Sequence, residues 1–231
     1  MNVAVYTLTR DRLDYTKHCF ETLQNKAGME FAHFVVDNGS VDGTQEWLKD
    51  VYQNTYQNVH LIFNDENRGI SVGSNQALDA IGVNYDLIIK MDNDCEVEYN
   101  NIIKRIVSVY ESMPMLSGQY MLSPRVEGII NQPKRHRDIM IDNVHIGIAG
   151  IVGGLFHCLP SHTYKQFRYD ESLPKAQGQD QQICGWVRDN GGEVGYMEPI
   201  VVKHYETTDG QCARYPEYFE RKWEEEKGYF K

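Results

Sequence analysis

The sequence DLIIKMDND, residues 86–94, joins a short apolar run to two aspartates separated by one residue. A continuous apolar run of this length is typical of a strand that is buried on both faces, as in a parallel sheet. Carboxylates at the end of such a strand can project into one cleft, and hard oxygen ligands suit Mg²⁺ or Mn²⁺ bound together with substrate phosphates. On its own, the cluster is equally consistent with an acidic turn that caps the following helix.

Strand-like and helix-like segments alternate outward from this run. Apolar runs predict further strands at 3–7, 31–36 and 59–63, and helical spacing predicts helices over 11–26, 44–51, 71–81 and 100–113. This alternation indicates an α/β protein with an open, mainly parallel sheet covered by helices on both faces. After residue 113 the pattern is less regular, with strands or close backbone approach expected over 146–155 and helices over 179–190 and 215–231.

Polar clusters follow the predicted strands in order. Asp37 begins the sequence Asp-Asn-Gly-Ser after the second strand, and Asn67-Arg68-Gly69 follows the third. Each cluster alone is more typical of a turn. In parallel α/β sheets, however, ligands bind at the carboxyl ends of the strands. Polar clusters at consecutive strand ends therefore predict a binding site at this edge of the sheet.

The composition is that of an ordinary globular protein, with 231 residues, 41% of them hydrophobic and 24% charged. A net charge of −10 argues against general affinity for nucleic acid or an anionic membrane. The five cysteines are widely spaced without a CxxC pair, which argues against a disulfide framework or a zinc site. We expect a cytoplasmic protein, since the sequence has neither a secretory signal pattern nor a membrane-length apolar stretch. The basic run 134–137 is expected to form a solvated loop, or alternatively to steer an anionic acceptor.

Four segments resemble the nucleotide-sugar-binding half of the family-2 glycosyltransferases. They are VAVYTLTRDR at 3–12, VVDNGSVDGT at 35–44, NRGISVGSNQALD at 67–79 and DLIIKMDND at 86–94. With weaker downstream matches, the resemblance covers nearly the whole chain. It implies a GT-A fold, which is a Rossmann-like open sheet between helices, in a single domain over 1–231. Residues 1–114 would form the nucleotide-sugar-binding half, and 115–231 the smaller acceptor-binding half with the C-terminal tail.

The resemblance also implies roles for individual residues. The residues that would bind the nucleotide sugar are Thr7, Thr9, Arg10, Asp37, Asn67, Arg68, Gly69, Asn75, Asp92 and Gly154, with Asp37 on the base and Gly154 near the sugar. Asp94 would hold the metal, Mn²⁺ or Mg²⁺, helped by Asp92 and by His204, which ends an apolar run at 201–205.

Asp180 is the candidate catalytic base. The sequence GQDQQ at 178–182 matches the position of the family's acidic "ED" element, although Gln179 and Gln182 stand where many members carry acids. An inverting transfer needs one carboxylate to accept the proton of the acceptor hydroxyl. Without the resemblance, Asp180 is more simply an acid favoured by the dipole at a helix N-terminus.

The expected function is inverting transfer of a sugar from a nucleoside diphosphate, by family frequency uridine diphosphate, to an unidentified hydroxyl. A glycan, a lipid-linked glycan, a protein and a modified nucleic acid all remain possible acceptors, and the oligomeric state cannot be read. One alternative is a nucleotidyltransferase, but residues 7–10 (TLTR) are not the Gly-rich basic loop that such an enzyme ordinarily carries. Another is a non-catalytic nucleotide-sugar- or glycan-binding module, which would tolerate replacement of Asp180.

Overall fold

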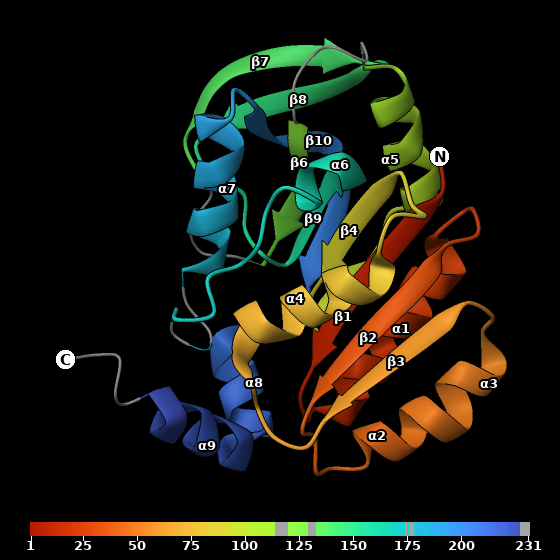
Figure 1. The fold of residues 1–231 in the computed structure, drawn as a ribbon, viewed down its shortest axis with the longest axis vertical. Coiled ribbons are helices and arrows are strands. Elements are labelled where there is room, and N and C mark those ends of the chain that lie inside the picture. Colours follow the sequence, from red (N-terminus) through yellow and green to blue (C-terminus); the bar gives the residue numbers. More distant parts are fainter. Residues whose placement is uncertain (114–119, 129–132, 174, 176–177, 227–231) are drawn as a thin grey trace.

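The first half of the chain forms the parallel part of the sheet in the computed structural model, which describes residues 1–113, 120–128, 133–173, 175 and 178–226. The strands β1 (Val3–Thr9), β2 (Ala32–Asn38), β3 (Val59–Asn64) and β4 (Leu87–Met91) lie in the order β3-β2-β1-β4, all parallel (Figure 1). Each is a short apolar run, as the sequence predicts. Side chains such as Ile89 in β4 are fully buried, and each contributes about 1.5–3 kcal/mol through the hydrophobic effect.

Strands of the second half extend this sheet past β4. The order continues β9 (Phe156–Pro160), β6 (Tyr120–Glu127), β10 (Glu193–His204), β8 (Val144–Ala149) and β7 (Arg135–Ile141). β6 and β10 are parallel, whereas the β4–β9, β6–β9, β10–β8 and β8–β7 pairs are antiparallel. The short strand β5 (Cys95–Val97) follows the aspartates and pairs with β10. The acidic cluster therefore leads into a strand, and the alternative of a turn that caps the next helix is wrong.

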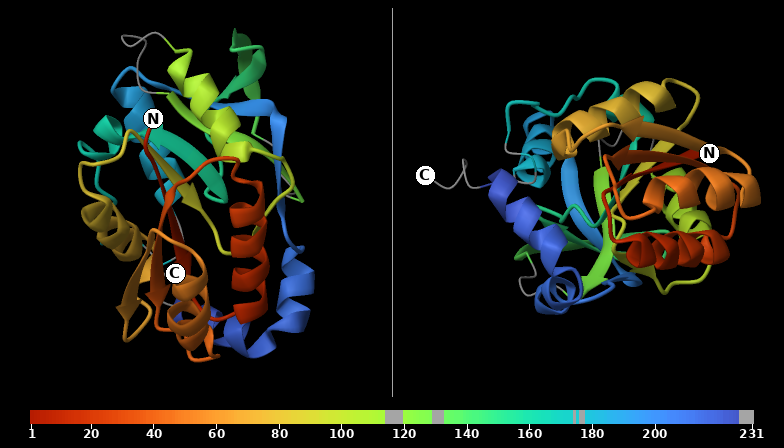
Figure 2. Two further views of the ribbon diagram at one scale, coloured as in Figure 1. Left: turned by 90° about the vertical axis from the view of Figure 1, so that its right-hand side faces the viewer. Right: turned by 90° about the horizontal axis from the view of Figure 1, so that it is seen from below.

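Helices cover both faces of the sheet. Hydrophobic side chains of α1 (Leu13–Lys26), of the π-helical turn η1 (Leu48–Tyr52) and of α5 (Ile102–Glu111) pack on one face. Those of α4 (Gly69–Ile81), α6 (Ser161–Tyr164) and α7 (Gln179–Asp189) pack on the other, and Figure 2 shows the two layers. The predicted helix over 44–51 consists of α2 (Thr44–Trp47), η1 and α3 (Gln53–Thr55). An α/β layered sheet flanked by helices is thereby confirmed.

Two C-terminal helices lie at the end of the sheet where β1–β4 finish. These are α8 (Thr208–Arg214) and α9 (Pro216–Glu226), drawn in blue at the bottom of Figure 1. Within the described residues, no helix has both the length and the apolar character needed to cross a bilayer. α8 and α9 therefore lie beside the carboxyl ends of the parallel strands.

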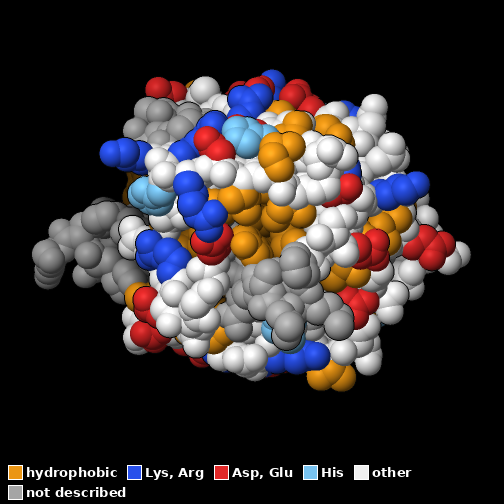
Figure 3. Space-filling model, turned by 90° about the horizontal axis from the view of Figure 1, so that it is seen from above, with side chains coloured by type: hydrophobic (Ala, Val, Ile, Leu, Met, Phe, Trp, Pro, Cys, Tyr) orange, Lys and Arg blue, Asp and Glu red, His pale blue; other side chains and the backbone are white. Residues whose placement is uncertain are grey.

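The basic run 134–137 is not a loop as expected. Arg135, His136 and Arg137 belong to the exposed edge strand β7, which pairs antiparallel with β8. Arg135 forms an ion pair with Glu198, and Arg137 with Glu193. Figure 3 looks onto this end of the molecule, where basic side chains, together with acidic and histidine side chains, lie along one side of an exposed apolar hollow.

Candidate functional site

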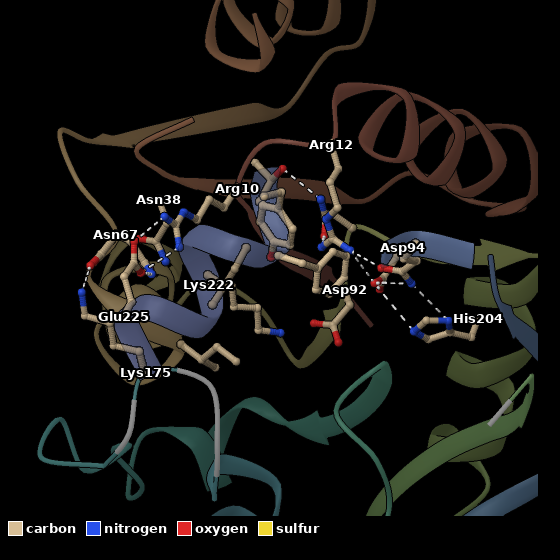
Figure 4. Close-up of a pocket in the computed structure, with 17 residues that line it drawn as sticks. Arg10, Arg12, Asn38, Asn67, Asp92, Asp94, Lys175, His204, Lys222 and Glu225 are labelled. Carbon is tan, nitrogen blue, oxygen red and sulfur yellow. Dashed lines mark hydrogen bonds and ion pairs between the residues drawn. The ribbon is translucent and has the colours of Figure 1, made fainter. Parts of the chain in front are cut away.

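Two adjoining cavities open at the carboxyl ends of the parallel strands. The larger, of about 280 Å³, is lined among others by Thr9, Arg10, Asn67, Asp94 and His204 (Figure 4). The smaller, of about 210 Å³, is lined among others by Ser74, Lys90, Gly154, Tyr169 and Asp180. Ile70 and Asp92 line both cavities. The two cavities therefore adjoin, with Asp92 at their junction, and together they are called the cleft.

Asp94 is buried at the inner end of the larger cavity, among nitrogen groups. Its Oδ2 accepts a hydrogen bond from Arg12 Nη1 at 3.1 Å and lies 3.7 Å from His204 Nε2. Gln211 of α8 donates to the same oxygen at 3.4 Å. Burial on its own would raise the pKa of Asp94, but the charges of Arg12 and His204 outweigh this effect and lower the pKa below its ordinary value.

The local backbone after β1 brings Arg12 to this position. Asp11 and Arg12 both adopt left-handed conformations, with φ of 51° and 58°. This region is costly for non-glycine residues, so surrounding contacts must hold it. Asp11 Oδ1 accepts a hydrogen bond from the Val41 amide at 2.8 Å, and Arg12 Nη2 donates to Asn93 Oδ1 at 2.9 Å. The Arg12 guanidinium also lies 4.8 Å from the ring centre of Tyr218 in α9.

Asp94 and His204 fit a divalent cation that is shared with a phosphate ligand. Two ligands at about 2.1 Å from a small cation lie about 3 Å apart, which is near the 3.7 Å between Asp94 Oδ2 and His204 Nε2. The described residues contain no group of three or more His, Cys, Asp or Glu that could enclose an ion. Mg²⁺ is commonly held by one or two carboxylates plus substrate phosphates, so such a site needs no complete protein cage. Because Arg12 binds the same oxygen, its guanidinium must shift when a cation enters.

Asp92 is bound by a side chain of β4 and by the backbone of residue 155. Its carboxylate forms an ion pair with Lys90, whose side chain is buried in β4, and its amide donates to the Leu155 carbonyl at 2.8 Å. The Asp92 side chain is 37% exposed and faces both cavities. Asp92 and Asp94 thus differ in role, since one borders the open cleft and the other lies within a buried network.

The outer part of the larger cavity holds an internal ion pair. Arg10 donates to both carboxylate oxygens of Glu225 in α9, at 2.9 and 2.6 Å, and Asn67 Nδ2 donates to the same group at 2.6 Å. Lys175 Nζ donates to the Asn67 carbonyl at 2.8 Å. Burial would raise the pKa of Glu225, but its bonds to Arg10 and Asn67 lower it overall. Arg10 and Asn67 are therefore arranged to bind an anionic group, and here that group is a side chain of the same protein.

Asp180 lies in the first turn of α7 and faces the smaller cavity. Its Oδ2 accepts a hydrogen bond from the Gly154 amide at 2.9 Å. A Cβ at residue 154 would lie 2.5 Å from Asp180 Oδ1, so no larger residue fits here without displacing the carboxylate. The structure therefore places these two predicted site residues next to each other, and their roles as base and sugar-proximal glycine stay predictions.

Other predicted site residues lie behind the cleft and not on its described lining. Asp37 accepts hydrogen bonds from Ser40 and Gln45, and Thr7 Oγ1 contacts the buried His33. Asn75 Nδ2 donates a hydrogen bond to the Tyr169 carbonyl, and Asn75 Oδ1 accepts one from the Tyr169 backbone amide. Arg68 is exposed, and Gly69, at φ +84°, begins α4. Thr7, Asp37 and Asn75 thus hold neighbouring segments through these bonds, and direct nucleotide contact by any of the five residues stays a prediction.

The sequence analysis did not identify several residues that the structure brings to the cleft. They are Arg12, Lys90, Lys175, Gln211, Tyr218, Lys222 and Glu225. Two of them stood within recognised motifs, Arg12 in VAVYTLTRDR and Lys90 as a charged residue in the apolar run of DLIIKMDND. The others belong to segments whose sequences carry no local signal for this site.

Comparison with known proteins agrees with this architecture. The family model for Glycosyl transferase family 2 matches residues 4–168. No curated relative matches the sequence. Among solved structures, residues 1–349 of S. aureus TarS superpose with a TM-score of 0.66 at 16% identity, covering 88% of this chain and 60% of that one. The mannosyltransferase PcManGT from Pyrobaculum calidifontis, in complex with GDP-Man and Mn²⁺, gives 0.68 at 13% identity, covering 92% and 59%.

A further similar structure is GalNAc-T7 with UDP, GalNAc and Mn²⁺, at a TM-score of 0.73 and 13% identity, covering 90% of this chain and 44% of that one. This chain therefore spans 60% or less of these three solved structures. At such low identity the superpositions establish the fold, and they confirm the expected GT-A arrangement. Since the family model covers most of the chain, from 4 to 168, the protein belongs to glycosyl transferase family 2.

Proposed function

We propose that this protein is an inverting, metal-dependent glycosyltransferase that moves a sugar from a nucleoside diphosphate, most simply UDP, to an acceptor hydroxyl. The observation that carries this proposal is the pair of adjoining cavities with Asp92 at their junction. A diphosphate bound near Asp94 in the larger cavity would direct its sugar past Asp92 toward Asp180 in the smaller one. Similar structures carry UDP-GlcNAc, UDP or GDP-Man, which supports a nucleotide-sugar donor.

The residues of the larger cavity would bind and orient the donor. Thr9, Arg10 and Asn67 would contact the nucleotide and its phosphates, and Asp94 with His204 would hold Mn²⁺ or Mg²⁺. When bound, the cation would supply positive charge that neutralises the diphosphate leaving group. Arg68 and Gly69 would line the nucleotide pocket beside Asn67, and Thr7, Asp37 and Asn75 would hold the segments around it. The proposal treats 1–231 as one domain, with donor binding in 1–114 and acceptor binding in 115–231.

Asp180 would act as the base. The acceptor oxygen forms a bond to the anomeric carbon, the bond from that carbon to the diphosphate breaks, and the hydroxyl proton passes to the Asp180 carboxylate. Attack from the face opposite the diphosphate inverts the anomeric centre. The Gly154 amide, which bonds Asp180 Oδ2 at 2.9 Å, would hold the carboxylate in place while its other oxygen accepts the proton. The acceptor can be a glycan, a lipid-linked glycan, a protein or a modified nucleic acid.

Calorimetric titration tests the donor site. UDP, GDP and their sugars would be titrated with and without Mn²⁺ into wild-type protein, Asp94→Ala, and the control Asp189→Ala, which alters an exposed acid at the end of α7. We expect one nucleotide to bind in a Mn²⁺-dependent way to the wild-type and control proteins, and Asp94→Ala to lose that dependence. Absence of binding by any nucleotide to the folded wild-type protein would refute the proposal.

A second variant separates catalysis from binding. Asp180→Asn is nearly isosteric and should bind the donor like the wild type, while nucleoside diphosphate release falls by about 100-fold or more, the range for loss of a general base. A non-catalytic binding module would show no turnover even in the wild type. A nucleotidyltransferase would instead join a nucleoside triphosphate to a sugar phosphate and release pyrophosphate.

A further inference from the structure

Lys90 is an unusual residue for the centre of the sheet. It lies in β4, flanked on either side by β1 and β9, and only 5% of its surface is exposed. The neighbouring residues on its strand, Ile89 and Met91, are fully buried and apolar. Moving an ammonium group out of water is costly unless it is paired and hydrogen-bonded. The groups that contact the Lys90 ammonium therefore indicate why a charged residue is placed here.

Both described partners of the Lys90 ammonium group belong to the cleft. Lys90 Nζ forms an ion pair with Asp92 and donates a hydrogen bond to the Gly154 carbonyl. Asp92 borders the larger and the smaller cavities, and Gly154 lines the smaller. The Lys90 ammonium group thus joins two groups that line the cavities, one of them at their junction.

The peptide of Gly154 links Lys90 to the candidate base. Its carbonyl accepts from Lys90, and its amide donates to Asp180 Oδ2 at 2.9 Å. A Cβ at residue 154 would lie 2.5 Å from Asp180 Oδ1, so the backbone and the carboxylate are in close contact. A displacement of this peptide would therefore move the carboxylate. One chain of contacts, Asp92–Lys90–Gly154–Asp180, crosses the cleft from donor side to acceptor side.

We propose that Lys90 is a positioning residue that fixes Asp92 and, through the Gly154 peptide, Asp180 at a set spacing across the cleft. This inference rests on the proposed function, in which Asp180 is the base. Lys90 does not need to touch the reacting atoms. Its loss should misplace the base relative to the donor and so lower kcat, while the donor-binding groups Arg10, Asn67 and Asp94 keep their own contacts and KM for the donor stays near its wild-type value.

A purely structural role for Lys90 predicts a different result. Methionine has a similar length and volume, and removing one partner of an ion pair is strongly destabilising only where the other charge is left buried without a partner. Asp92 remains in contact with water, since its side chain is 37% exposed, so Lys90→Met leaves no sealed-off charge. We therefore expect Lys90→Met to fold with a Tm near that of the wild type. A structural role would show as a lowered Tm with unchanged kcat in the folded fraction.

The test compares three variants, Lys90→Met, Lys90→Arg and Lys104→Met. For each, it measures Tm and the Kd of the donor by calorimetry. It also measures kcat and KM for release of nucleoside diphosphate from the donor, with water or an added acceptor. Lys104 is exposed on α5 and serves as the matched control. We expect Lys90→Met to lower kcat by about 100-fold, as misplacement by an ångström can do, with KM and Kd within about threefold. Lys90→Arg should restore part of kcat because it keeps the charge, and Lys104→Met should match the wild type.

A second background decides whether Lys90 acts through the base. In Asp180→Asn the base is already lost, so adding Lys90→Met should lower kcat little further. Additive losses, unchanged kcat in Lys90→Met, or a raised KM at unchanged kcat would each overturn the positioning role. Failure of the proposed function is a separate result, because Asp180→Asn would then keep full turnover whatever Lys90→Met does.

Discussion

His33 is a buried titratable residue whose state depends on folding. It lies in β2 at 1% exposure, with Nδ1 2.7 Å from the Tyr52 hydroxyl and Nε2 3.1 Å from Thr7 Oγ1. Burial lowers the pKa of His33 to about 3. The imidazole is thus neutral in the folded protein and can satisfy one donor and one acceptor. Protonation would place an unpaired charge in the core beneath the cleft.

Acid should therefore destabilise the fold through His33. An unfolded histidine has a pKa near 6.5, so the unfolded state binds the proton more readily. The free energy of unfolding is therefore unaffected by protonation of His33 above pH ~6.5. It falls as the pH drops from there toward 3, and the loss is about 2 kcal/mol at pH 5. The free energy of unfolding in urea would be measured at pH 7.5 and 5.0 for wild type, His33→Gln and the control His136→Gln, at an exposed position in β7. Wild type and control should lose about 2 kcal/mol more than His33→Gln, and equal losses in all three would contradict the assignment.

Individual site residues could be predicted only in part. The sequence placed Asp92, Asp94, Arg10 and Asn67 at strand ends, and the structure brings all four to the cleft. Their proposed chemical roles stay predictions. Asp37 also ends a strand, but its carboxylate accepts hydrogen bonds from residues three and eight positions later. Spacing along a strand locates a residue at the sheet edge, whereas its hydrogen-bond partners depend on the loop that follows.

At the scale of elements, strands with continuous apolar runs were predictable and the edge strand was not. β1, β2 and β4 are buried on both faces, so most of their residues are apolar. β7 is mostly exposed and begins with Arg135-His136-Arg137, which gives no strand pattern. It forms because β8 supplies a partner, and charged residues on such an edge oppose pairing with other chains. Its strand character is a property of the tertiary structure.

The helix α9 was predicted from the sequence, but its position against the cleft was not. A closing helix over 215–231 was predicted, and α9 spans Pro216–Glu226. Local sequence does not reveal that Glu225 bonds Arg10, which lies 215 positions earlier, or that Arg221 bonds Asp11. These contacts set α9 across the mouth of the larger cavity, with its carboxylate on two groups that are proposed to bind the donor.

Weakening this contact should improve nucleotide binding. Glu225→Gln removes the negative charge that competes with a nucleotide phosphate for Arg10 and Asn67. Calorimetric titration with UDP and Mn²⁺ should give a Kd about three- to tenfold lower than wild type, since the binding-competent fraction rises. Glu220→Gln, on the exposed side of the same helix, should leave Kd unchanged. Weaker binding by Glu225→Gln would instead mean that the carboxylate contacts the nucleotide directly.

At the scale of the whole molecule, the two halves share both of their hydrophobic cores. The cluster on the α1 and α5 face contains Ile89 from the first half and Val202 from the second, and the opposite cluster contains Ile88 and Leu159. β9, from the second half, pairs with β4 over the whole length from Leu87 to Met91. Separation of the halves would expose both clusters and an unpaired central strand. We therefore expect the two sides of the cleft to belong to one folding unit.

The protein should accordingly unfold in a single step. Trp47 packs against the first cluster and Trp186 against the second, so variants that retain only one of them report on opposite halves. Their urea midpoints should coincide with each other and with the loss of helical circular dichroism. Leu159→Ala, which removes a fully buried side chain of β9, should destabilise the chain by about 2–5 kcal/mol and shift both midpoints equally. If the Trp186 midpoint moved while that of Trp47 stayed, the halves would be separate domains, and the fixed spacing between Asp92 and Asp180 would depend on an interface and not on a shared core.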